Sequence, residues 1–181
     1  MARVPLISLA QASGDTQAVL HRIQQLFGTV PAMFQATANS EAALKHMWAG
    51  FGALAGGKLP PKLKEQLAVA IADRNECEYC LAAHTALALK AGATTQEIVD
   101  AQAGRSSDPQ TAATLGFALK IVEQRANVRD EDFEQLRRAG YDDETIVEML
   151  AHVALNLFTN YVNVALRVPV DFPAVKLRKT A

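Results

Sequence analysis

Residues 76–84 have the sequence Glu-Cys-Glu-Tyr-Cys-Leu-Ala-Ala-His, which contains both cysteines of the 181-residue chain and one of its four histidines. Asn75 is suited to the N-cap position of a helix, and Gly92 is suited to the left-handed position that follows a helix. The stretch therefore predicts a helix that starts at this motif, with Cys77 in its first turn, and ends before Gly92.

The two cysteines and the histidine lie on one side of this predicted helix. Positions three and four apart are surface neighbours, so Cys77, Cys80 and His84 form one stripe, with about 5–6 Å between the Cα atoms of the cysteines. That separation is within the range of disulfides. The partial positive charge at the helix N-terminus favours a thiolate, and His84 lies within reach of Cys80. The arrangement indicates reversible thiol chemistry.

Three other interpretations of the cysteines stay open at this point. In an intracellular chain, cysteines are often small buried hydrophobic residues. A zinc site is the second interpretation, but two cysteines and one histidine supply only three of the four ligands of a tetrahedral site. The third is a structural disulfide, which would close a short loop and constrain the unfolded chain little.

The preceding helix brings a carboxylate to the motif. Pro60-Pro61 starts a predicted helix over residues 62–72, and the short connection after it requires an antiparallel hairpin. If the turn centres between residues 74 and 75, Glu65 lies opposite His84. Glu65 could then orient the imidazole or relay a proton. Alternatively, its negative charge is simply favoured in the first turns of its helix.

Five residues closely resemble, in type and spacing, the active-site pattern of the AhpD-like alkylhydroperoxidases, a branch of the carboxymuconolactone decarboxylase family: Glu65, Cys77, Tyr79, Cys80 and His84. The resemblance extends to the sequence Ala-Gly-Ala-Thr-Thr-Gln-Glu-Ile of residues 91–98 and covers about residues 45–165. The motif is specific, because decarboxylase members of the family lack the cysteine pair.

The resemblance implies a role for each residue. Cys80 would be the peroxidatic thiol and Cys77 the resolving thiol, with Glu65 and His84 as a proton relay. Tyr79 stands where some members carry a relay histidine, although a phenol is a far weaker base near neutral pH. The implied activity is reduction of alkyl hydroperoxides or hydrogen peroxide through a dithiol–disulfide cycle without metal, haem or flavin. An external dithiol, lipoyl-bearing or thioredoxin-like, would restore the thiols.

The rest of the chain is predicted to be helical, and no strand-like alternation of useful length occurs. The Ala-Gly and Ile-Val pairs of residues 91–99 recur in residues 139–147, 48 residues later. Two copies are too few for a solenoid. We expect an all-α, AhpD-like fold with an internal helical-hairpin repeat. The chain, residues 1–181, would be a single domain with a core of about residues 45–165 and an N-terminal helical extension over residues 1–40.

Composition and charge restrict the partners. A net charge of −1 at pH 7 argues against nucleic acid or an anionic membrane surface as the main partner. No targeting signal is recognisable, so we expect a cytoplasmic protein whose thiols are kept reduced between turnovers. The apolar first and last helices, together with the habit of the family, predict a homo-oligomer, either a trimer or a hexamer.

The last predicted helix, residues 143–167, carries a polar stripe formed by His152, Asn156, Asn160 and Asn163. Such polar residues make a lipid-spanning segment improbable. A partly solvated side is the favoured interpretation, and a subunit interface or an active-site wall is the alternative. Two other function classes also stay open for the whole chain: a decarboxylase of the carboxymuconolactone type on the same fold, and a non-catalytic thiol redox sensor or oligomeric binding protein.

Overall fold

Short polar side chains cap the start of several helices. The structure, a computed structural model that describes residues 1–178, contains α-helices and no strand over that range, which confirms the all-α prediction. Side chains of Ser40, Thr94, Asp108 and Asp142 each accept a hydrogen bond from a backbone amide in the first turn of a helix. The helices are α1 (Gly14–Phe27), α2 (Ala32–Thr37), α3 (Glu41–Ala55), α4 (Pro61–Arg74), α5 (Glu78–Lys90), α6 (Thr95–Gln102), α7 (Pro109–Glu123), α8 (Asp130–Arg138) and α9 (Asp143–Leu166).

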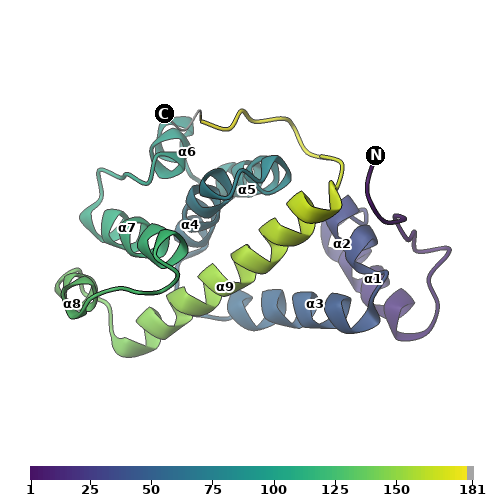
Figure 1. Ribbon diagram of the computed structural model, residues 1–181, viewed down its shortest axis with the longest axis horizontal. Coiled ribbons are helices and arrows are strands. Elements are labelled where there is room, and N and C mark those ends of the chain that lie inside the picture. Colours follow the sequence, from purple (N-terminus) through teal and green to yellow (C-terminus); the bar gives the residue numbers. More distant parts are fainter. Residues whose placement is uncertain (179–181) are drawn as a thin grey trace.

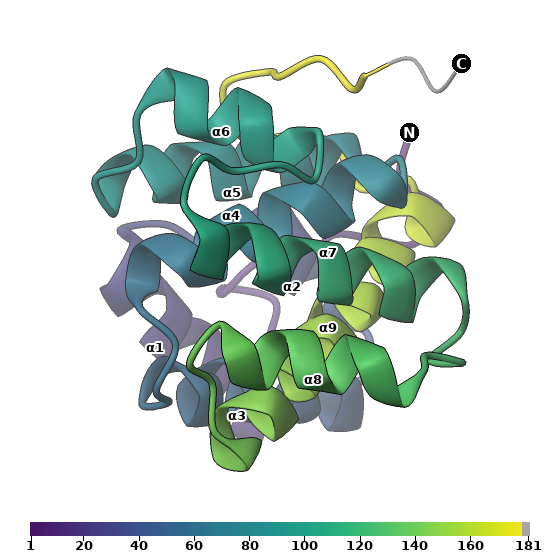
Figure 2. The ribbon, with the colours of Figure 1, turned by 90° about the vertical axis from the view of Figure 1, so that its left-hand side faces the viewer.

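Helix α9 crosses the molecule diagonally, with α1 to α3 on one side of it and α4 to α8 on the other (Figure 1). A view turned by 90° shows α6, α5, α4 and α7 stacked above α8 (Figure 2). Helix α4 packs against α5, α6, α7 and α9, and its residues 67–73 are all buried. Residues 67–72 are apolar on every side, as burial requires, and the alanines among them let the neighbouring helices approach closely.

The turn between α4 and α5 differs from the prediction. Asn75 is the C-cap of α4 and not the N-cap of α5, and the N-cap of α5 is Cys77. Glu76 has a left-handed backbone with φ of 53°. Its amide donates to the Asp73 carbonyl at 3.1 Å, and the Cys77 amide donates to the Ala72 carbonyl at 2.9 Å. These two bonds form a Schellman stop.

The two sequence copies share the same helix stop. Gly92 after α5 and Gly140 after α8 both have positive φ, 87° and 94°. In each copy the next amide donates back to the last turn of the helix, from Ala93 to Ala88 at 2.9 Å and from Tyr141 to Leu136 at 3.1 Å. A capped helix follows directly in both places, which agrees with the predicted helical-hairpin repeat. The division into a core and an N-terminal extension stays a prediction.

Helix α9 is the one helix in residues 1–178 that is long and apolar enough to cross a membrane, judged by length and composition alone. Its polar stripe is buried in the protein, with Asn156, Asn160 and Asn163 exposed by 7%, 0% and 3%. The helix packs against α2, α3, α4, α5 and α7. The favoured expectation of a partly solvated polar side is therefore wrong.

The segment after α9 is extended and lies over α5 and α6. The Asp171 carboxylate accepts a hydrogen bond from the Ala32 amide at the start of α2. Farther along, Arg178 pairs with the buried Asp73 of α4, with 3.1 Å between Arg178 Nε and Asp73 Oδ2. The segment thus ties α2 to the end of α4 that precedes the cysteine turn.

The Schellman stop predicts opposite effects for two neighbouring glycine substitutions. Glu76→Gly removes the Cβ strain of a left-handed residue and should raise the free energy of unfolding by about 0.5–1 kcal/mol, after the larger entropy of the unfolded glycine is deducted. Glu78→Gly, in the first turn of α5, should lower it by about 0.5–1 kcal/mol, because glycine weakens a helix and a favourable negative charge is lost. Denaturant unfolding of the oxidised proteins measures both values. Shifts of the same sign would contradict the assignment of the turn.

Candidate active site

The two cysteines form a disulfide at the start of α5. Cys77 and Cys80 have their Cα atoms 5.3 Å apart, within the distance predicted for neighbours on a helix. Both residues are buried, with exposures of 1% and 2%. The dithiol pair therefore belongs to the interior surface between α5 and its neighbours and not to an open face of the molecule.

Both sulfurs accept a hydrogen bond from an N–H group. The backbone amide of Cys80 donates a hydrogen bond to Cys77 Sγ at 3.2 Å, as the N-cap position requires. From the opposite side, the side-chain amide of Asn163 on α9 donates to Cys80 Sγ, also at 3.2 Å. Each sulfur thus faces an N–H group, which favours negative charge on sulfur when the pair is reduced.

Glu65 and His84 are in contact, as the hairpin register predicts. His84 Nδ1 lies 2.7 Å from Glu65 Oε2, and their side chains are exposed by only 16% and 22%. Glu65 is on α4 and His84 is on α5, so the contact joins the two helices. A carboxylate on Nδ1 fixes the orientation of the ring and leaves Nε2 to exchange a proton with a reacting group. His84 follows Cys80 by one helical turn on α5.

Tyr79 points away from this pair, toward α2 and the C-terminal segment. Its hydroxyl accepts a hydrogen bond from the Met33 amide at 3.3 Å, and its ring packs edge to face on Phe172 at 5.7 Å between centroids. Burial, and next the negative charge of Asp171, raise the pKa of the Tyr79 hydroxyl well above its ordinary value. The phenol stays protonated near neutral pH. These contacts anchor the N-terminal turn of α5, and a relay role for Tyr79 stays a prediction.

Asn163 is the functional contact that the sequence analysis did not single out. The polar stripe on α9 was visible, and an active-site wall was one interpretation of it. Asn163 does line the dithiol, whereas Asn156 donates to the His152 carbonyl of its own helix at 2.9 Å. Asn160 accepts a hydrogen bond from Asn75 at 2.9 Å and so connects α9 to the cysteine turn. Only the packing of α9 on α5 separates these three roles.

His152 is buried in the same stripe, 3.5 Å from the Glu148 carboxylate. Burial, and next the positive charge of Lys64, lower the pKa of the imidazole below its ordinary value. His152 is therefore neutral near pH 7.

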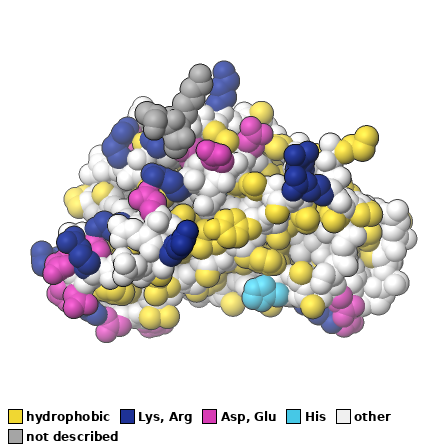
Figure 3. Space-filling view, in the orientation of Figure 1, with side chains coloured by type: hydrophobic (Ala, Val, Ile, Leu, Met, Phe, Trp, Pro, Cys, Tyr) yellow, Lys and Arg dark blue, Asp and Glu magenta, His cyan; other side chains and the backbone are white. Residues whose placement is uncertain are grey.

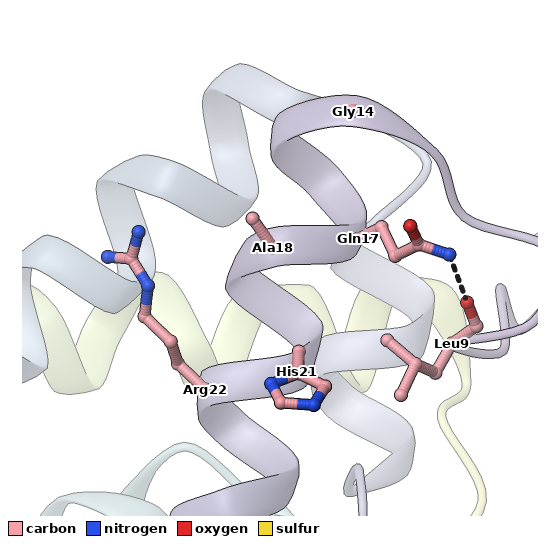
Figure 4. A pocket seen from close by; sticks show the side chains of 6 residues that line it. All are labelled: Leu9, Gly14, Gln17, Ala18, His21 and Arg22. Carbon is pink, nitrogen blue, oxygen red and sulfur yellow. Dashed lines mark hydrogen bonds between the residues drawn. The ribbon is translucent and has the colours of Figure 1, made fainter.

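The remaining histidines lie in simpler surroundings. His46 packs edge to face on Phe158, and His21 is exposed on α1 beside a shallow hollow where Gln17 donates to the Leu9 carbonyl (Figure 4). Within residues 1–178, no group of three or more His, Cys, Asp or Glu side chains is arranged to hold a metal ion.

Known proteins resemble the chain in sequence and in fold. The model of the carboxymuconolactone decarboxylase family matches residues 40–124. A crystal structure described as an AhpD core, an uncharacterized peroxidase-related protein from Ralstonia eutropha JMP134, is 27% identical, with 94% of this chain and 92% of that chain covered and a TM-score of 0.81. An uncharacterized peroxidase-related protein from Silicibacter sp. TM1040 is 25% identical, with 93% and 91% covered and a TM-score of 0.80.

A more distant structure shares the fold alone. The debrominase Bmp8, in complex with 2,3,4-tribromopyrrole, is 21% identical, with 94% of each chain covered and a TM-score of 0.77. No curated protein matches the sequence. The family match spans the cysteine motif, and the solved structures extend the likeness over nearly the whole chain. Residues 40–124 thus resemble the carboxymuconolactone decarboxylase family, and the chain shares the AhpD-like fold of the peroxidase-related proteins.

Proposed function

We propose that the protein is a thiol-dependent peroxidase that reduces hydroperoxides through the Cys77–Cys80 pair. The observation that carries the proposal is a dithiol at a helix start, placed one turn from a histidine that a carboxylate holds by its Nδ1. A dithiol can supply the two electrons that reduction of a peroxide requires, and the imidazole can accept and donate the proton. The peroxidase-related names of the two more similar structures support the same activity.

The reaction has two steps on the protein. The Cys80 thiolate attacks one peroxide oxygen, so that an S–O bond forms as the O–O bond breaks, and the leaving alkoxide takes a proton from the His84 imidazolium. Cys80 is now a sulfenic acid and the peroxide has become an alcohol. The Cys77 thiolate then attacks the Cys80 sulfur, which forms the disulfide and releases the oxygen as water.

The reduced dithiol must be regenerated by an external dithiol, of the lipoyl-bearing or thioredoxin-like kind, in a reducing compartment such as the cytoplasm. Both cysteines are buried, and the partly exposed side chains nearby are those of His84 and Glu65. We expect small hydroperoxides to react faster than bulky ones for this reason.

Two local features compete over which cysteine attacks first. The N-cap position places the amides of α5 on the Cys77 sulfur, which favours a thiolate there. Cys80 has the Asn163 amide and lies one turn from His84, which can take its proton. We assign the attack to Cys80, because only this sulfur combines a donor with a nearby base.

The cysteine pair also distinguishes the peroxidase from other functions on this fold. A decarboxylase of the carboxymuconolactone type would have no use for two thiols. Debromination by a distant relative shows that the fold supports more than one chemistry. A non-catalytic redox sensor would form the same disulfide but would not consume peroxide repeatedly, so turnover separates it from a peroxidase.

We further propose that the protein assembles as a homo-trimer or homo-hexamer. Helix α9 exposes Val147, Tyr161 and Val164 by 64%, 59% and 48%. Hydrophobic side chains gather in a band across this face of the molecule (Figure 3). An exposed apolar band of this kind is typical of a surface that another chain covers.

Serine variants of the cysteines test the proposed division of roles. With a dithiol reductant present, Cys80→Ser should consume no hydroperoxide at any pH, because the attacking sulfur is gone. Reduced Cys77→Ser, freed of reductant before peroxide is added, should react once and stop with a sulfenic acid on Cys80, seen as one added oxygen by peptide mass spectrometry. The reverse pattern would assign the attack to Cys77, and undiminished turnover in both variants would end the dithiol proposal.

Substitution of the relay residues tests the proton step. His84→Gln should slow peroxide reduction at neutral pH by about 10²–10⁴-fold, because general-base assistance is lost, and the rate should recover in part as pH rises. Glu65→Gln should act in the same direction but less, since it removes only the group that orients the ring. Single-turnover oxidation from pH 6 to 9 measures both, with the exposed His21→Gln as the matched control. Wild-type rates for His84→Gln at every pH would show that His84 only packs.

Light scattering at micromolar concentration tests the assembly. We expect a mass that is three or six times that of the 19.5 kDa chain. The physical reason is that burial of the α9 band removes apolar surface from water. A strictly monomeric mass would contradict the assembly and leave the dithiol chemistry untouched.

A further inference from the structure

The side-chain amide of Asn163 uses its donor group but not its acceptor group in hydrogen bonding. Its Nδ2 donates to Cys80 Sγ at 3.2 Å, whereas its Oδ1 is buried and has no hydrogen-bond partner among the described residues. The residue as a whole is 3% exposed, so water does not compensate from bulk solvent. A buried acceptor without a partner costs free energy, and its presence next to a reactive sulfur points to a ligand that fills it.

We propose that Asn163 is a catalytic residue with two arms, on the basis of the peroxidase function proposed above. The donor arm, Nδ2, stabilises the Cys80 thiolate. The acceptor arm, Oδ1, receives the O–H of the hydroperoxide and so holds the terminal oxygen beside the sulfur that attacks it. The ligand of this subsite is therefore a group with an oxygen-bound hydrogen at its terminus, as hydrogen peroxide and alkyl hydroperoxides have.

The chemistry of the transfer suits this assignment. When the sulfur electron pair forms the S–O bond, the terminal oxygen keeps its hydrogen, and the product is the sulfenic acid S–O–H. The same O–H can donate to Asn163 Oδ1 before and after the transfer. The other oxygen leaves as alkoxide and takes its proton from His84, whose ring is held by Glu65.

The surroundings keep the amide in place. Asn160, one turn earlier on α9, is tied through its Oδ1 to Asn75 in the cysteine turn at 2.9 Å. The stripe therefore has a fixed position relative to the N-terminus of α5. The amide contact also distinguishes the two sulfurs, because Asn163 donates its hydrogen bond to Cys80 Sγ, whereas Cys77 Sγ accepts one from a backbone amide. This contact gives Cys80 a thiolate stabiliser that offsets the N-cap advantage of Cys77.

Substitution of Asn163 changes no titratable group on the elements around Cys80. His84 lies on α5, Glu65 lies on α4 and the neutral His152 lies on α9, and the N-cap residue Cys77 is serine in every protein that is compared. The experiment uses the Cys77→Ser protein, in which Cys80 is the one remaining thiol of the chain. Any change in the pKa of the Cys80 thiol on substitution of Asn163 then measures the effect of the Asn163 amide.

The first measurement needs no peroxide. The alkylation rate of Cys80 by iodoacetamide is followed from pH 5 to 10 in Cys77→Ser alone and with Asn163→Leu or Asn163→Ala added. Loss of a hydrogen bond to a charged sulfur should move the midpoint of the profile to higher pH by about one to two units. The matched control is Asn156→Leu, which removes a buried amide of the same helix that donates to the His152 carbonyl, and which should keep the parental midpoint.

The second measurement separates the acceptor arm. Oxidation of Cys80 by hydrogen peroxide should slow about 10–100-fold at neutral pH in both Asn163 variants, and about tenfold of that loss should persist above the new midpoint, where the thiolate is fully formed. Parental midpoints in both variants would overturn the donor arm, and complete recovery at high pH would overturn the acceptor arm. A parent protein that alkylates normally but does not react with peroxide would instead contradict the proposed function.

Discussion

The register between α4 and α5 determines which side chains meet at the dithiol. One residue, Cys77, ends the Schellman stop of α4 through its amide and starts α5 as its N-cap. Because the two helices share this residue, neither can rotate or slide without breaking the turn. The same register places Glu65 of α4 against His84 of α5, 19 residues later in the chain. The positions of Cys80 and of its base, His84, are therefore determined by the turn and not by long loops.

The close packing around α4 makes this register rigid. Its apolar, alanine-rich centre is covered by α5, α6, α7 and α9, so the helix that carries Glu65 is fixed from several directions. Helix α9 brings the polar groups that the apolar core cannot supply. Asn160 binds the cysteine turn and Asn163 binds a sulfur. A buried polar contact of this kind is tolerated only where each partner is held in place.

Local sequence signals predicted most of the fold. The stop at Gly92, and the matching Ala-Gly pair of residues 139–140, marked two helix ends because glycine is the residue type that a left-handed position favours. The start of α5 was misplaced, because Cys77 and not Asn75 is its N-cap. Glu76 occupies a left-handed position where glycine is usual, so the stop had no visible signal and Asn75 was taken as the start of the next helix.

The site was predictable where it depends on one hairpin and not where it depends on distant packing. The spacing of Cys77, Cys80 and His84, and the position of Glu65 opposite them, follow from helix geometry and a short turn. The contact of Asn163 with Cys80 joins residues 83 positions apart. No periodicity within α9 can say which of its three asparagines faces a sulfur, because that depends on how α9 crosses α5.

The central claim is that the buried dithiol transfers two electrons to a hydroperoxide. The most direct measurement is the stoichiometry of a single turnover: fully reduced wild-type protein is mixed with limiting amounts of a small alkyl hydroperoxide, and thiols, peroxide and alcohol are counted together. We expect that one alcohol forms and two thiols disappear for each peroxide consumed, with Cys77 and Cys80 linked in the product. Peroxide that remains while both thiols persist would contradict the claim.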